Sequence, residues 1–187
     1  ATAFDPIASL PAVQAHAGAA AELLSIEAKF VKSNGTLDLT VTDPYRPRVE
    51  YEFFIPEQAD GKAAPPLGAG GVEGGFYNKK VSVDVYEPGQ WRHVRTFGGD
   101  VSSEYSYQNK GMDRDEGSLV FDNPRPAPAP ACSFGVLWQV AMEKGAPADA
   151  LAGIRYNLTY DGEPRYEFRI EGSNHKYEFK ADCQIVN

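Results

Sequence analysis

Residues 166–182 read YEFRIEGSNHKYEFKAD, and this stretch indicates the class of fold. Its apolar and polar residues alternate on either side of a turn-forming segment, Gly172-Ser173-Asn174. The apolar positions are Tyr166, Phe168 and Ile170 before the turn, and Tyr177, Phe179 and Ala181 after it. Alternation with a period of two is typical of antiparallel strands that have one buried face and one solvated face. The stretch therefore predicts a β-hairpin near the C-terminal end of the polypeptide.

A similar pattern occurs earlier in the sequence, where residues 51–55 (YEFFI) nearly repeat residues 166–170 (YEFRI). Each segment follows a hairpin-type turn signal, Asn34-Gly35 in one case and Asp161-Gly162 in the other. Each is also preceded by residues at helical spacing. These are the apolar Ile7, Leu10, Val13 and Ala17 before Gly18, and Phe134, Leu137, Val140 and Lys144 with the same spacing before Gly145. We therefore predict an α+β fold of two related helix-plus-antiparallel-sheet units, with the helices packed on the apolar sheet faces.

Segments rich in proline and glycine set the predicted boundaries. We expect a first unit at residues 1–123, with long loops at 56–75 and 98–123, and a second unit at 132–187. Between them, residues 124–131 carry an alternating proline run that predicts an extended spacer. The sequence leaves open whether the two units share one continuous sheet.

Composition and charge exclude several classes of function. The 187 residues include 18 Lys plus Arg against 26 Asp plus Glu, which gives a formal net charge of −8. Nucleic acids and anionic membranes select clustered basic residues, so neither is an expected partner. No apolar run approaches the roughly 20 residues that cross a bilayer, so we expect no transmembrane segment.

The two cysteines, Cys132 and Cys183, bear on the compartment of the protein. They predict one structural disulfide, which would contribute roughly 3–4 kcal/mol by closing a loop of about 50 residues. Two unrelated buried thiols are the alternative. The sequence also starts at Ala1 without an initiating Met, as a processed mature terminus or a trimmed polypeptide would. We therefore expect an oxidising location, either periplasmic or extracellular.

The closing hairpin, Tyr166 to Asp182, resembles the PepSY-type module of bacterial cell envelopes, in which a short helix precedes strands that often end in an acidic residue. Asp182 occupies that acidic position, and the resemblance covers about 45 residues in each unit, less well in the first. The resemblance implies a non-catalytic, extracytoplasmic module, possibly in tandem, that binds or restrains another protein. It transfers no catalytic residues and no cofactor.

The sequence shows no recognisable catalytic constellation. The three histidines, His16, His93 and His175, do not have the spacing of a zinc site, and the cysteines form no CxxC pair. A GxSxG nucleophile elbow is absent as well. A triad that assembles only in the folded protein remains open, so whether the protein is an enzyme is uncertain, and a non-enzyme is favoured.

Two other groups of residues are candidate sites. Asp113, Asp115 and Glu116 place three carboxylates in a short glycine-flanked stretch, which is either a solvated turn or a weak calcium site. Trp91, Tyr105 and Tyr107 are candidate contact residues on a binding surface, or else ordinary cross-strand packing. We predict a secreted or periplasmic binding module that contacts a protein or cell-envelope component. The alternatives are a small extracellular hydrolase or a subunit of a surface assembly.

Overall fold

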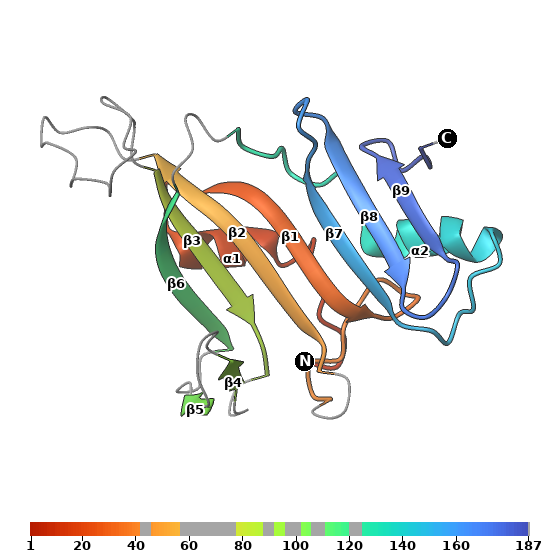
Figure 1. Cartoon of the computed structure of the whole chain (residues 1–187), viewed down its shortest axis with the longest axis horizontal. Helices are drawn as coiled ribbons and strands as arrows, with labels where there is room; N and C mark the ends of the chain where they lie inside the picture. Colours follow the sequence, from red (N-terminus) through yellow and green to blue (C-terminus); the bar gives the residue numbers. More distant parts are fainter. Residues whose placement is uncertain are drawn as a thin grey trace, which may run out of the picture.

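The computed structural model describes residues 1–41, 46–56, 78–87, 92–95, 102–105, 111–119 and 125–186. Seven antiparallel strands form one sheet in the order β6-β3-β2-β1-β7-β8-β9 (Figure 1). In sequence order these strands are β1 (Glu22–Val31), β2 (Arg48–Pro56), β3 (Asn78–Val85), β6 (Met112–Leu119), β7 (Ala152–Leu158), β8 (Pro164–Ile170) and β9 (Lys176–Lys180). A separate two-stranded sheet contains β4 (Arg92–Arg95) and β5 (Ser102–Tyr105). The helices are α1 (Leu10–Ala17) and α2 (Phe134–Glu143).

The predicted fold of two helix-plus-sheet units is wrong, because the structure is mostly a single seven-stranded antiparallel sheet with two short helices. β1 pairs with β7, and the paired residues run from Ser25 and Asn157 to Val31 and Ala152. An isolated strand edge exposes unpaired N–H and C=O groups, and this pairing satisfies the edges of both strands at once. The helices have only 8 and 10 residues and lie behind the same face of the sheet in Figure 1.

Several local predictions are confirmed. α1 ends at Ala17, directly before Gly18, and α2 ends two residues before Gly145. The predicted turns at Asp161-Gly162 and Gly172-Ser173-Asn174 join β7 to β8 and β8 to β9. The loop predicted at 56–75 lies almost entirely outside the described residues, whereas the one predicted at 98–123 contains β5 and β6.

The face of the sheet that the helices cover forms the hydrophobic core. One row of cross-strand neighbours spans the whole sheet and consists of Arg114, Val83, Tyr51, Ile26, Tyr156, Tyr166 and Phe179. All of them except Arg114 are buried. Leu10 and Val13 of α1 are buried too, and Trp138 of α2 meets the ring of Phe168 edge-on at a centroid distance of 4.9 Å.

Four polar side chains of this row bind the backbone of the segments that cover the sheet. Three of the side chains donate to a backbone carbonyl at 2.8 Å: Arg114 Nε to Ala17 O, Tyr51 OH to Pro6 O, and Tyr156 OH to Pro128 O. The fourth, Tyr166 OH, accepts a hydrogen bond from Cys132 N at 3.0 Å. Burial raises the pKa of the Tyr51 and Tyr156 phenols above the ordinary value of about 10, so both remain protonated donors at neutral pH. We call these four residues the tether row.

The proline-rich segment packs against the sheet at the seam between β1 and β7. Ala127 is buried, and its N–H donates to Leu23 O at 2.7 Å. Its neighbour Pro128 accepts the hydrogen bond from Tyr156 of β7. The segment predicted as a spacer thus contacts both strands of the seam.

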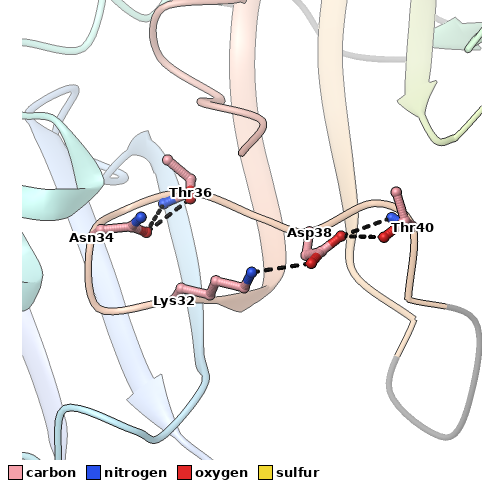
Figure 2. A network of polar contacts seen from close by, with 5 residues as sticks. All are labelled: Lys32, Asn34, Thr36, Asp38 and Thr40. Carbon is pink, nitrogen blue, oxygen red and sulfur yellow. Dashed lines mark hydrogen bonds and ion pairs between the residues drawn. The ribbon is translucent and has the colours of Figure 1, made fainter. Parts of the chain in front are cut away.

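Short-range hydrogen bonds shape the connection between β1 and β2 (Figure 2). Asn34 Oδ1 accepts from both the N–H and the hydroxyl of Thr36, and Asp38 Oδ1 accepts in the same way from Thr40. Lys32 Nζ lies 3.2 Å from Asp38 Oδ2. The hydrogen bonds that Asp38 accepts from the Thr40 and Lys32 side chains lower the pKa of its carboxyl group. The polar side chains thereby fix a backbone that buries Leu37 and Leu39 beneath it.

The predicted disulfide between Cys132 and Cys183 is present, with the two Cα atoms 5.8 Å apart. It joins the start of α2 to the C-terminal tail, which runs beside β9. Lys180 N donates to Gln184 O at 2.9 Å, and Val186 N donates to Glu178 O at 2.8 Å. The tail therefore covers part of the outer edge of β9, and the disulfide fastens it there.

We expect the substitution Tyr156→Phe to lower the free energy of unfolding by about 1–2 kcal/mol, because it leaves the carbonyl of Pro128 without its donor. Urea denaturation followed by circular dichroism measures the change. Tyr160→Phe is the matched control, since Tyr160 is fully exposed at 102% and should show no change. Equal effects of the two substitutions would contradict the prediction that the hydrogen bond from Tyr156 to Pro128 stabilises the fold.

Replacing both cysteines by serine should lower the free energy of unfolding by roughly 3–4 kcal/mol, because the unfolded polypeptide regains the entropy of a loop that spans 51 residues. The same urea experiment measures this loss. A reductant should then destabilise the wild-type protein and leave the double variant unchanged. A wild-type unfolding midpoint that does not respond to reductant would contradict the prediction.

Candidate functional site

The face of the sheet opposite the helices is charged and faces the viewer in Figure 1, where no described helix covers it. A row of outward positions crosses all seven strands and consists of Asp113, Asp84, Glu50, Glu27, Arg155, Glu167 and Glu178. Glu52, Arg169 and Lys180 lie on the same face as this row. We call this surface the outer face.

Carboxylates gather on the half of the outer face formed by β6, β3, β2 and β1. Burial raises the pKa of Glu50, and its neighbours Asp84, Glu52 and Glu27 raise it further through charge repulsion, which Arg48 partly opposes. Lys80 forms an ion pair with Glu52 in the same region. Among the residues that the structure describes, no group of three or more His, Cys, Asp or Glu side chains is arranged to hold a metal ion.

A hollow of about 760 Å³ lies on the outer face next to these carboxylates, where β1, β7 and β8 meet. Gly153 is central to it, because this glycine takes an outward position of β7 and has no side chain to fill the surface. The lining also includes Glu27, Lys29, Phe30, Leu151, Arg155, Glu167, Arg169, Ile170 and Glu171. We call this feature the Gly153 hollow.

A bulge in β1 forms one wall of the Gly153 hollow. The register between β1 and β7 shifts between Ala28 and Val31, and Phe30 within that interval has φ +66°. A positive φ is unfavourable for a bulky residue, and such strained positions are frequent at ligand sites. The strained residue and the strand glycine thus lie together at one place on the outer face.

The cations around the hollow differ in their partners. Lys29 Nζ lies 3.3 Å from Glu27 Oε1, and Arg169 Nη2 lies 2.5 Å from Glu171 Oε1. Arg155 is exposed and stands between Glu27 and Glu167 in the strand register. Nevertheless, it makes no ion pair with any residue in the described part of the protein. The hollow therefore presents one guanidinium with its hydrogen-bond donors available.

The predicted calcium ligands do not form a turn, because they lie in β6. Asp113 and Asp115 are on the outer face. Glu116 takes a position of the opposite, helix-covered face and forms an ion pair with Arg114. Of the predicted binding-surface residues, Trp91 and Tyr107 lie outside the described residues, and for Tyr105 only the backbone of β5 is described.

The two histidines whose side chains are described do not line the Gly153 hollow. His16 is exposed on α1, and His175 Nδ1 lies 2.9 Å from the hydroxyl of Tyr177 at the β8–β9 turn. His93 lies in β4, where only the backbone is described.

Sequence reasoning missed the hollow, although one signal was available. Gly153 takes an outward position between the apolar residues Ala152 and Ile154, and a glycine inside a strand often marks a place where a ligand or another backbone approaches closely. The positive φ of Phe30, by contrast, could not be predicted from the residues around it in the sequence.

Comparisons with protein-family models, with curated proteins and with solved structures found no match. The resemblance of residues 166–182 to the PepSY-type module therefore stays a prediction. Of the described helices, neither has the length and apolar character of a membrane-spanning helix.

We expect Gly153→Val to preserve the fold and to raise the free energy of unfolding by up to about 1 kcal/mol, because a β-branched residue is favoured over glycine in a strand. Among the described residues, a Cβ atom there meets only Arg169 O, at 3.9 Å. Gly35→Ala is the contrasting variant, since its Cβ would lie 2.2 Å from Gly135 N on a backbone with φ +83°. It should lose more than about 2 kcal/mol in urea denaturation. A comparable loss in both variants would show that Gly153 is structural.

Proposed function

We propose that this protein is a secreted or periplasmic binding module that contacts a protein or cell-envelope component and does not turn over a substrate. The contact surface is the outer face, centred on the Gly153 hollow. The observation that carries the proposal is the hollow itself, with its unfilled floor at Gly153 and its unengaged guanidinium at Arg155.

The chemistry of the lining supports binding rather than catalysis. Among the described residues that line the hollow there is no Ser, Thr, Cys, His or Tyr, so its reactive side chains are Lys29 and the carboxylates of Glu27, Glu167 and Glu171. Two of its carboxylates, Glu27 and Glu171, are engaged in ion pairs with Lys29 and Arg169. Such a lining can bind through charge and apolar contact.

The disulfide supports the compartment. Cys132 and Cys183 are joined, and bonds of this kind persist in oxidising environments and are rare where thiols are kept reduced. The resemblance to the PepSY-type module implies the same kind of protein, an extracytoplasmic module that binds another protein.

The test is a comparative capture from native envelope and secreted fractions, with partners quantified by mass spectrometry. The bait proteins are the wild type, the double variant Gly153→Val/Arg155→Gln and the control Lys144→Gln. Lys144 is exposed at the end of α2, so the control removes one positive charge away from the outer face. We expect a partner that the wild type and the control retain and the double variant loses by at least about tenfold. Retention of the same proteins by all three baits would contradict the proposal.

A further inference from the structure

We propose that the Gly153 hollow binds a small aliphatic carboxylate, with the carboxylate on Arg155 and the apolar group on Leu151. This inference rests on the proposed function, because it specifies the ligand chemistry of the same site. The charges around the hollow and the identity of the side chains that line it support the inference.

The charges of the hollow disfavour a multivalent anion. Three cations line it, Lys29, Arg155 and Arg169, together with three carboxylates, Glu27, Glu167 and Glu171. Lys29 and Arg169 have acidic partners in Glu27 and Glu171, which leaves Arg155 as the cation available to a ligand, with Glu167 beside it on β8. Because the lining carries no net charge, its carboxylates repel a divalent phosphate more strongly than a single carboxylate, and the latter can pair with one guanidinium.

The geometry of a guanidinium favours a carboxylate in particular. Its planar, parallel N–H groups donate two hydrogen bonds to the two oxygens of one carboxylate. Arg155 is a suitable donor because no other described residue occupies those N–H groups through an ion pair. A ligand amide in place of the carboxylate would lose both the charge and one of the two acceptors.

The apolar part of the ligand has a place in the same hollow. Leu151 is an exposed large hydrophobic residue, with 37% of its surface accessible. It directly precedes β7 and lines the hollow together with Gly153 and Arg155.

The hollow limits the ligand to a small one. Such a ligand carries a carboxylate for Arg155 and an aliphatic group for Leu151, and it lies over Gly153, where no side chain blocks it. Ile170 and Phe30 add further apolar surface to the lining. Two sources offer this chemistry, a free branched aliphatic acid and the C-terminal residue of a peptide that ends in an aliphatic side chain.

The experiment is an NMR titration of the ¹⁵N-labelled full-length protein with three probes. Acetyl-Ala-Leu carries the free carboxylate, acetyl-Ala-Leu-amide lacks it, and 4-methylpentanoate has the carboxylate and the branched group without peptide units. We expect amide shifts at residues 151–156 and 28–31 with acetyl-Ala-Leu, and at least tenfold weaker binding of the amide. Saturation by 4-methylpentanoate at similar concentration would assign the site to free aliphatic acids, whereas binding of the peptide alone would assign it to the C-terminal ends of peptides.

Matched variants connect the binding to the named residues. Arg155→Gln should weaken acetyl-Ala-Leu at least tenfold and Gly153→Val should abolish its binding, while Lys144→Gln should leave it unchanged. Spectra and urea midpoints like those of the wild type show that each variant is folded. Equal affinity for the acid and the amide, shifts outside the hollow, or undiminished binding by Arg155→Gln would overturn the inference.

The failure of this inference is distinguishable from the failure of the proposed function. If capture of a partner depends on Gly153 and Arg155 but none of the three probes binds, only the ligand class is wrong. If the acid binds as expected and no captured protein depends on these residues, the hollow is a small-molecule site and the proposed contact with a protein or envelope component is wrong.

Discussion

The hydrogen bonds of the tether row are the constraint on which the rest of the structure depends. A single sheet must cover one of its faces, and here the cover consists of two short helices and irregular segments. Helices of 8 and 10 residues are not stable alone, and a covering loop brings backbone groups that need partners. Tyr51, Tyr156 and Tyr166 bury large rings and still offer a polar atom at the tip. The sheet therefore supplies both the apolar contact and the hydrogen bonds that hold its cover in place.

Because the described helices lie on one face, the opposite face is free to carry charge. That face is divided, with carboxylates over β6 to β1 and most of the basic residues over β7 to β9. The Gly153 hollow lies close to the division, where a missing side chain and the bulge at Phe30 lower the surface. The fold thus separates its two tasks, since stability resides on the covered side and recognition is proposed for the other.

The sequence predicted what is local. The alternation at 166–170, the helix ends at Gly18 and Gly145, and the disulfide all follow from residue type and short spacing. The pairing of β1 with β7 did not follow. Whether β1 lies at the edge of a sheet or pairs with a further strand depends on contacts with strands far away in the sequence. β6 was also missed, since its residues MDRDEGSL lack apolar alternation, as an edge strand can. The hollow required the backbone angle of Phe30 and the outward position of Gly153, which only the folded structure provides.

The seam between β1 and β7 has a consequence for how the polypeptide reaches its native state. Ser25 and Asn157 are partners in the sheet, so β1 has no neighbour on that side until most of the polypeptide has been synthesised. Contacts between residues so distant in sequence form slowly, and an open strand edge beside an apolar face promotes aggregation meanwhile. A protein truncated before residue 152 would lack β7, and β1 would keep one unpaired edge.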